Sequence, residues 1–293
     1  MTVTLLSSTP NALEVLLYTK NTRLQMTGHG LTDIMAWPEE KKAEQLRYMR
    51  NTIQSSWEFV DYTFAIEGVT RAFTHQLVRH RVGTSFAQQT QRGLQMEEGF
   101  AYLATGDMSR SGTPETKRSV RTTYVPDIDI HHGTMDDVYA QTMDAIDVSY
   151  DHLLRHGANA QDARGILPTN ILTNIVFKAN LRTLHDMALK RLCVKAQGEF
   201  QDVFRALVDA VVAIHPWAID FLRVQCAWNG TCLFPTLPVE ECPVKRHVYD
   251  PQACESYGSA ANLPGNNTLL PPDQIYQIHR ATHASVQPKV IAV

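Results

Sequence analysis

The sequence predicts an α+β fold in which helices predominate around one sheet, and three observations carry this prediction. Residues 39–57, 136–155 and about 199–224 carry apolar side chains at three- and four-residue spacing, which is typical of amphipathic helices. Residues 58–67 are rich in β-branched and aromatic side chains in rough alternation, which is typical of a strand. This mixture of helices with a strand favours the α+β class.

The first predicted elements lead from a charged helix into the strand and then into a short helix. The few large apolar residues of 39–57 recur every three or four positions, so this helix would bury one narrow face. After strand 58–67, residues 69–80 are expected to be helical, and Gly83 is expected to stop that helix.

The later elements begin with a polar stretch. Residues 104–134 are rich in Gly, Ser, Thr, Asp and Arg, so they are expected to form a long loop or insertion. Helix 136–155 follows it. A further helix is expected after Pro168, and another from about 180 to 195. Helix 199–224 would be the longest, with an apolar stripe along its buried face.

Two domain segments are expected: residues 1–225 as the main folded domain, and residues 226–293 as an extended C-terminal segment that covers the surface or a neighbouring subunit. The extension is rich in Pro, Gly and Asn. It also holds four of the five cysteines, which are Cys193, Cys226, Cys232, Cys242 and Cys254. Because no C-x-x-C pair is present, separately buried reduced thiols are the leading interpretation, with a structural zinc site or a disulfide as alternatives. No metal-ligating residue is predicted.

Composition sets the broad class of protein. The apolar fraction is 44%, the charged fraction is 19% and the net charge is −3, as expected for a globular enzyme. A net charge this small gives no reason to expect binding to nucleic acid or to a membrane surface. No run approaches the roughly 18 apolar residues of a membrane span, and the N-terminal stretch has no basic leader, so a cytoplasmic protein is expected.

A dense basic cluster carries the chemistry. Gln76 and Arg79 share a face of the predicted helix 69–80, and His80 and Arg81 close its last turn. Hydroxyl and amide side chains follow, including Gln88 and then the Thr90-Gln91-Arg92 run. Cations at a helix C-terminus can simply complement the helix dipole. Their density here favours a site that holds a phosphate or an electron-rich ring.

Three ordered blocks resemble the flavin-dependent thymidylate synthase family. Arg79-His80-Arg81 followed by Thr90-Gln91-Arg92 resembles its Arg-His-Arg signature and the Ser-x-Arg beyond, with a gap of eight residues in place of seven. The run 163–168, Ala-Arg-Gly-Ile-Leu-Pro, resembles its Ala-Arg-x-x-Leu-Pro block. The run 180–184, Asn-Leu-Arg-Thr-Leu, followed by Arg191 and the Ala-Gln-x-Glu of 196–199, resembles its third block. The resemblance covers roughly residues 55–225.

The resemblance implies a fold, a reaction and roles for single residues. It implies a helix-rich domain with a mixed or antiparallel sheet, assembled as a homotetramer with sites at subunit interfaces. It implies methylation of dUMP to dTMP with methylenetetrahydrofolate, FAD and NADPH, without an enzymic covalent nucleophile. Residues implied to bind dUMP are Gln76, Arg79, Gln88, Thr90, Arg92, Arg164 and Arg191, with Arg191 catalytic at the uracil. Residues implied to bind FAD are Arg79, His80, Arg81, Gln88, Asn180, Arg182 and Asp186. His80 is expected to orient the flavin, with a ring that can titrate near neutral pH.

Helix geometry tests part of this assignment. Positions 180, 184, 187 and 191 would lie on one stripe, so Asn180 and Arg191 are expected to face the same way. Arg182 and Asp186 stand four apart on another face, where an ordinary surface ion pair is the alternative. Functional groups on two faces of one helix fit a site assembled from several chains.

Departures from the family pattern leave two other functions open. Phe59 stands where the family commonly has His, Thr90 replaces Ser, and Asp186 replaces Asn or His. A related enzyme acting on another pyrimidine nucleotide, such as dCMP, or transferring a hydroxymethyl group is therefore an alternative. A second alternative is an inactive nucleotide- or nucleic-acid-binding homologue, motivated by the basic residues of segment 104–134, which are Arg110, Lys117, Arg118 and Arg121.

Overall fold

The computed structural model describes residues 1–22, 29–52, 54–91, 99–103, 116–234, 236–238, 241–245, 277 and 289–290. The chain forms two compact units. Unit 1 comprises Met1 and residues 66–79 and 86–176, and unit 2 comprises residues 2–65, 80–85 and 177–293. The α+β class and the predominance of helix are confirmed, while the division at residue 225 stays a prediction.

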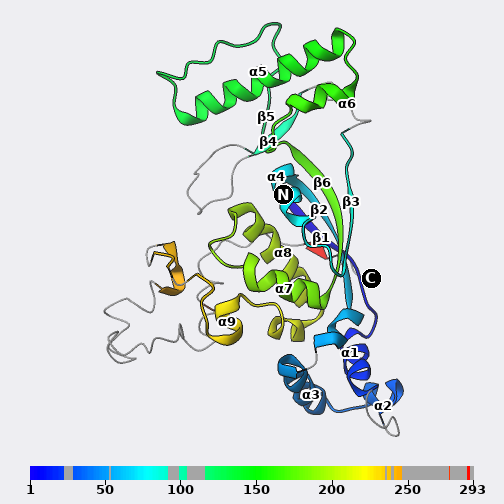
Figure 1. The fold of residues 1–293 in the computed structure, drawn as a ribbon. Coiled ribbons are helices and arrows are strands. Elements are labelled where there is room, and N and C mark those ends of the chain that lie inside the picture. The colour runs from blue at the N-terminus through cyan, green and yellow to red at the C-terminus, as the bar shows by residue number, and fades with distance from the viewer. Residues whose placement is uncertain are drawn as a thin grey trace. The chain divides into compact units, whose positions relative to one another are not determined.

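One five-stranded sheet has the order β3-β6-β2-β1-β7 (Figure 1). Its strands are β1 (Thr2–Ser8), β2 (Asp61–Thr70), β3 (Thr84–Gln88), β6 (Leu172–Asn180) and β7 (Lys289–Val290). The β3–β6 pair is antiparallel, because hydrogen bonds join Asn180 to Gly83 at one end and Gln89 to Asn174 at the other. β1 and β7 are parallel. The sheet is thus mixed.

The core of unit 2 is formed by one face of the strands and by helices. In β2, Tyr62 and Phe64 are fully buried, and the Phe64 ring stacks on Phe177 of β6 at 6.2 Å between centroids. α8 (Gly198–Ile214) packs on β1 and on α7 (Leu181–Arg191). The N-terminal part of unit 2 contains α1 (Ala12–Asn21), α2 (Leu31–Met35), α3 (Glu39–Thr52) and the 3-10 helix η1 (Gln54–Phe59).

Unit 1 is built around α5 (Met135–Arg155). A capping box begins this helix, since Thr134 accepts from the backbone N–H of Asp137 and the Asp137 carboxylate accepts in return. These bonds lower the pKa of Asp137. The remaining elements are α4 (Arg71–Leu77), α6 (Ala160–Ala163), the 3-10 helix η2 (Arg164–Ile166) and the antiparallel pair β4 (Ala101–Leu103) and β5 (Thr116–Arg118).

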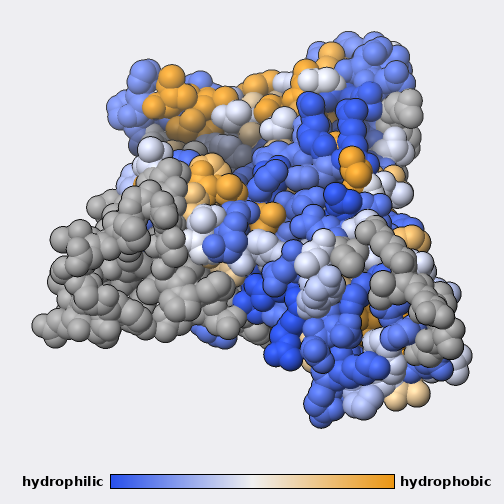
Figure 2. Space-filling view, turned by 60° about the horizontal axis from the view of Figure 1, so that its bottom comes forward, coloured by the Kyte–Doolittle hydropathy of each residue, from blue (hydrophilic) through white to orange (hydrophobic). Residues whose placement is uncertain are grey.

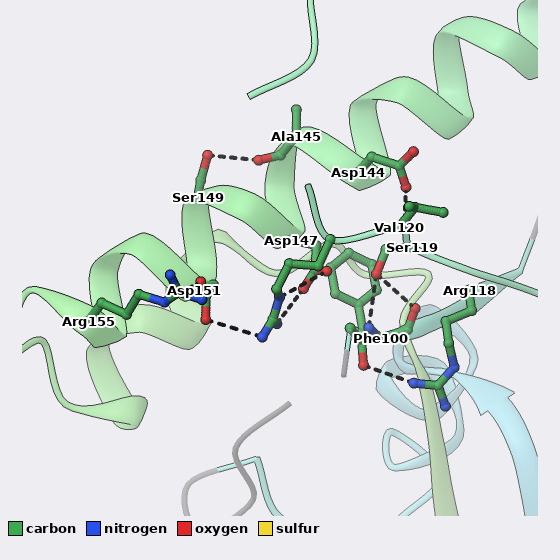
Figure 3. Close-up of polar contacts among 12 residues, drawn as sticks. Phe100, Arg118, Ser119, Val120, Asp144, Ala145, Asp147, Ser149, Asp151 and Arg155 are labelled. Carbon is green, nitrogen blue, oxygen red and sulfur yellow. Dashed lines mark hydrogen bonds and ion pairs between the residues drawn. The ribbon is translucent and has the colours of Figure 1, made fainter. Parts of the chain in front are cut away.

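A polar network holds the segment after β5 against α5 (Figure 3). The Asp147 carboxylate is fully buried and accepts from the Arg121 guanidinium at 2.8 Å. Arg121 also meets Asp151 at 3.2 Å, and Asp151 meets Arg155 at 2.8 Å. The Val120 N–H donates to Asp144 at 2.7 Å. The described part of the predicted 104–134 loop is therefore tied down by charge and contains strand β5, which the sequence did not predict.

Several predicted elements need correction. Strand 58–67 begins later, at Asp61, because residues 54–59 form a 3-10 helix, and it continues to Thr70. The helix predicted for 69–80 is shorter than expected, because only α4 (Arg71–Leu77) is helical there. The helix expected after Pro168 is wrong: residues 172–180 form strand β6, in which buried and exposed side chains alternate. Helix 136–155 and the helix of about 180–195 are confirmed as α5 and α7.

The C-terminal part also differs from expectation. The helix predicted for 199–224 ends at Ile214, because Pro216 lacks the N–H that would continue it, and the short 3-10 helix η3 (Pro216–Asp220) follows. Beyond it, α9 (Gln225–Asn229) begins a segment that is partly buried. Cys226, Cys242 and Val244 lie in one apolar cluster with Val194, so this described part is packed into unit 2 and is not an extended tail.

The four cysteines within the described residues form no disulfide; they are Cys193, Cys226, Cys232 and Cys242. Burial first, and then the neighbouring thiols, raise the pKa of Cys226 to about 12. Cys254 lies outside the described residues. Among the helices that the structure describes, none is long and apolar enough to cross a membrane.

Candidate active site

In unit 1 two arginines from distant segments stand together. Arg71 is the first residue of α4, and Arg164 is the first residue of η2. The backbone brings these segments side by side, since the N–H groups of Arg71 and Ala72 donate to the carbonyls of Ile171 and Thr169 at 3.1 and 2.8 Å. Burial lowers the pKa of the Arg71 guanidinium, and the charge of Arg164 lowers it further. Two neighbouring guanidinium groups repel each other, and an anion placed between them would reduce that repulsion.

The hydrogen bonds of Arg71 support that interpretation. Its Nη2 donates to the Gln89 carbonyl at 3.3 Å. Its Nε–H is buried and has no hydrogen-bond partner within the described residues. A buried donor without an acceptor is costly, and a bound oxyanion would supply the acceptor. Arg164 donates through Nε to the Gln161 carbonyl at 3.1 Å.

The other predicted nucleotide-binding residues of unit 1 lie on α4 and β3 or beside them. Gln76 is half-buried on α4, and Arg79 is exposed just after it. Gln88, the last residue of β3, donates from Nε2 to the Thr74 hydroxyl at 2.9 Å, and Thr90 is exposed two residues later. Arg92 lies outside the described residues.

In unit 2 a tight turn follows His80. Gly83 has a φ of +68°, and an added Cβ would stand 2.4 Å from Nδ2 of Asn180 and 2.5 Å from Oγ1 of Thr183, so only glycine fits. The Gly83 carbonyl accepts from the Asn180 N–H at 3.1 Å, and the Val82 carbonyl accepts from the Thr183 hydroxyl at 2.7 Å. The start of α7 therefore fixes this turn.

Asn180 has a structural role at the start of α7. It is the N-cap of α7, and its Oδ1 accepts from the Thr183 N–H at 2.9 Å. Asn180 therefore lies just before the helix and is not part of the predicted helical stripe. The other positions of that stripe lie within α7, where Leu184 and Met187 are buried and Arg191 is half-buried.

At the other end of α7, Arg191 meets His80. Its Nε and Nη2 lie 3.3 and 3.2 Å from the His80 Nε2, and its Cζ lies 4.4 Å from the centroid of the Phe200 ring. Burial, and then the charges of Arg191 and Lys190, lower the pKa of His80 to about 4. The expectation that this ring titrates near neutral pH is therefore wrong, because desolvation and two cations disfavour the imidazolium.

The remaining residues predicted to bind flavin are exposed or only partly buried. Arg81 is exposed. Arg182 forms an ion pair with Glu58 of η1. The alternative considered from the sequence, a surface ion pair between Arg182 and Asp186, is therefore not what the structure shows. Asp186 is exposed on α7, where its charge opposes the lowering of the His80 pKa.

Three residues of these clusters were not predicted: Arg71, Phe200 and Glu58. Arg71 is 93 positions from Arg164, and Phe200 is 120 positions from His80, so no local spacing links them. Arg71 does begin α4 directly after the Thr70 cap, and an arginine there is a signal that a search for basic residues could have used.

Together, the fold and these clusters define an α+β protein with two neighbouring arginines in unit 1 and a half-buried arginine–histidine pair in unit 2. The family model described as thymidylate synthase complementing protein matches residues 4–217. The flavin-dependent thymidylate synthase of Nitratidesulfovibrio vulgaris is 30% identical over 240 residues, covering 78% of this chain and 90% of the relative. That of Clostridium tetani is 28% identical over 235 residues, covering 78% and 89%. The chain belongs to the flavin-dependent thymidylate synthase family.

Solved structures share the fold. The flavin-dependent thymidylate synthase of Helicobacter pylori, complexed with FAD and dUMP, is 23% identical with a TM-score of 0.55, covering 76% of this chain and 100% of that chain. A UMP/dUMP methylase from Streptomyces cacaoi, bound with 5-Br dUMP, is 20% identical with a TM-score of 0.55, covering 76% and 97%.

Proposed function

We propose that the protein methylates dUMP to dTMP, taking the one-carbon unit from methylenetetrahydrofolate with FAD as cofactor and NADPH as reductant. The observation that carries this proposal is the Arg71–Arg164 pair, with its buried Nε donor that has no partner in the described residues. A nucleotide monophosphate supplies the matching charge and acceptors. Family membership supplies the reaction class.

The residues of unit 1 would bind the nucleotide. Arg71 and Arg164 would hold the phosphate by charge-assisted hydrogen bonds, and Arg92 would join them. Gln76, Arg79, Gln88 and Thr90 would position the rest of dUMP. Arg71 is an addition to the set that the sequence indicated.

The residues of unit 2 would act on the base and the cofactor. Arg191 would be the catalytic residue, since a half-buried guanidinium can stabilise negative charge that develops on the uracil carbonyl. When bound, FAD supplies reducing equivalents and mediates the one-carbon transfer. Arg79 and Arg81 are exposed guanidinium groups that suit its diphosphate, and Gln88, Asn180, Arg182 and Asp186 complete the proposed flavin contacts.

A homotetramer in the cytoplasm, with sites formed by several chains, completes this proposal. Unit 1 exposes large apolar side chains that a partner subunit could cover, and Figure 2 shows apolar residues on the surface in the upper part of the view. These side chains are each at least 55% exposed and follow β5: Val120, Tyr124, Val125, Ile130 and Met135. Exposed apolar patches of this kind mark interaction surfaces.

A different pyrimidine substrate is the alternative within the same chemistry. Phe59 is 60% exposed on η1, and Asp186 is exposed on α7, so both departures from the family pattern can face a ligand. The UMP/dUMP methylase among the structural neighbours shows that the shared fold occurs with another named substrate range. The competing outcome is methyl transfer to another pyrimidine deoxynucleotide such as dCMP, or hydroxymethyl transfer to dUMP or dCMP.

An inactive nucleic-acid-binding homologue has less support. Arg118 donates to the Gly99 carbonyl at 3.2 Å, and Arg121 is held by two aspartates. Both side chains therefore have partners inside unit 1. Arg110 lies outside the described residues.

The decisive experiment is product analysis with the purified, flavin-loaded protein. The protein is incubated with methylenetetrahydrofolate, NADPH and either dUMP or dCMP, and the products are identified by mass. We expect dTMP in the incubation with dUMP and no product in the incubation with dCMP. Product from dCMP alone, or a mass increase of a hydroxymethyl group, would replace the proposal by the alternative. Absence of turnover with salt-dependent DNA binding would favour the inactive homologue.

A further inference from the structure

Two rings from separate segments meet the Arg191 guanidinium. His80 stands just after α4 in the chain, and Phe200 lies in the first turn of α8. We propose that His80 and Phe200 are positioning residues that hold the Arg191 guanidinium, and that His80 does so by accepting its hydrogen bonds at Nε2. This inference rests on the proposed function, in which Arg191 is the group that acts on the substrate.

The geometry constrains the guanidinium in two directions. The His80 Nε2 receives Nε and Nη2 of Arg191 at 3.3 and 3.2 Å, which fixes the rotation of the planar group about its normal. The Phe200 ring lies under it, with 4.4 Å from Cζ to the ring centroid, which fixes its tilt. The His80 and Phe200 rings themselves meet edge to face at 6.3 Å.

Both supports are anchored. The His80 carbonyl accepts from the Thr84 hydroxyl at 2.6 Å, and the turn that follows is bonded to the start of α7 through Val82 and Gly83. Phe200 is fully buried and lies beside Phe204, with 6.5 Å between their ring centroids. A side chain held by rigid neighbours loses less freedom when it meets the transition state.

The protonation state of His80 matches this role. An Nε2 that accepts from a guanidinium carries no proton, so the ring is the neutral tautomer with its proton on Nδ1. Burial and the charges of Arg191 and Lys190 keep the pKa of His80 low, against the opposing charge of Asp186. A protonated His80 would have no lone pair for Arg191 and would repel it. His80 thus supports Arg191 through Nε2, and the flavin contact that the family resemblance implies for His80 stays a separate prediction.

The first test uses magnetic resonance of the intact protein labelled at the histidine rings. The His80 signal is identified by its disappearance in His80→Gln. We expect the Nδ1–H tautomer and no titration above about pH 5, and we expect Arg191→Gln to raise the His80 pKa because one neighbouring charge is removed. A His80 ring that titrates near its ordinary value in the wild-type protein, or that does not respond to Arg191→Gln, would overturn the inference.

The second test uses kinetics with flavin content measured in parallel. We expect His80→Leu and Phe200→Leu to lower kcat by roughly 10- to 100-fold while KM for the nucleotide and FAD content stay near wild type. His80→Gln should recover part of kcat, because its amide oxygen can accept from Arg191. His131→Gln, at an exposed loop histidine, is the matched control. Loss of FAD from His80→Leu with unchanged kcat in the reloaded enzyme would assign His80 to the flavin and refute the positioning role.

The two tests separate this inference from the proposed function. If the wild-type protein forms no dTMP, the proposed function fails, while the His80 tautomer and its response to Arg191→Gln still decide whether the positioning contact exists.

Discussion

Unit 1 contains two arginine environments of opposite construction. Arg121 is neutralised inside the protein, since the fully buried Asp147 and the half-buried Asp151 both bind its guanidinium. Arg71 is instead placed beside another cation, Arg164, and keeps a buried Nε–H without a hydrogen-bond partner in the described residues. The first arrangement connects a loop to a helix. The second places two like charges side by side, an arrangement that a bound anion would stabilise and that is more typical of a binding site than of a structural ion pair.

Breaking the Arg121 pair should give the largest effect on stability. We expect Asp147→Asn to lower the free energy of unfolding by about 3 kcal/mol, because it leaves a partly buried guanidinium short of its charge partner. Urea unfolding would measure this, with Asp127→Asn at an exposed loop position as control. Activity per folded molecule should stay close to wild type. A loss below about 0.5 kcal/mol would show that Asp151 alone neutralises Arg121.

Changing the Arg71–Arg164 pair should have the opposite effect, with activity lost and stability kept. We expect Arg71→Gln to lower kcat/KM for dUMP by about 100-fold, since one charge-assisted contact to the phosphate is lost, with no decrease in stability. Steady-state kinetics and thermal unfolding on the same samples would compare the two. If Arg71→Gln unfolds the protein and spares kcat/KM, the pair is structural and the contrast with Arg121 disappears.

Ligand protection sharpens the same comparison. Saturating dUMP should raise the melting temperature of the wild-type protein by a few degrees, because a ligand that binds only the folded state stabilises it by mass action, about 2.7 kcal/mol at 100 times Kd. The shift should vanish in Arg164→Gln and persist in Arg155→Gln, which alters only the exposed end of the Asp151 network. Deoxyuridine without phosphate should protect neither. An equal shift with deoxyuridine would contradict a phosphate site.

The smallest expected effect is on the pH dependence of stability, and it comes from His80, the neutral partner of Arg191. Because the folded-state pKa of His80 is lowered to about 4 from 6.5, the unfolded chain takes up a proton at His80 at higher pH than the folded protein does. His80 therefore lowers stability as pH falls from about 6.5 towards 4 and has no such effect above 6.5. We expect His80→Gln to lose less stability than wild type between pH 7 and pH 5, as measured by urea midpoints. An equal loss would mean that His80 titrates normally.

The helices with clear periodicity were predicted well, whereas short elements were not. α5 and α7 carry caps and stripes within their own residues, so local spacing identifies them. Strand β6 was predicted as a helix, because its apolar residues follow a proline and its alternation becomes evident only when one face is buried against the sheet. The early end of α8 at Ile214 could have been read from Pro216.

For the candidate site, the sequence by itself determined the residue types and their order along the chain. The basic run Arg79-His80-Arg81, the Arg164 block and the Asn180–Arg191 helix were sufficient to indicate the family. Only the tertiary structure decided their electrostatics. Pairing Arg71 with Arg164, and His80 with Arg191 over Phe200, depends on contacts between segments about 90 to 120 positions apart. Burial and neighbouring charge shift protonation through distance in space, and spacing along a sequence does not record that distance.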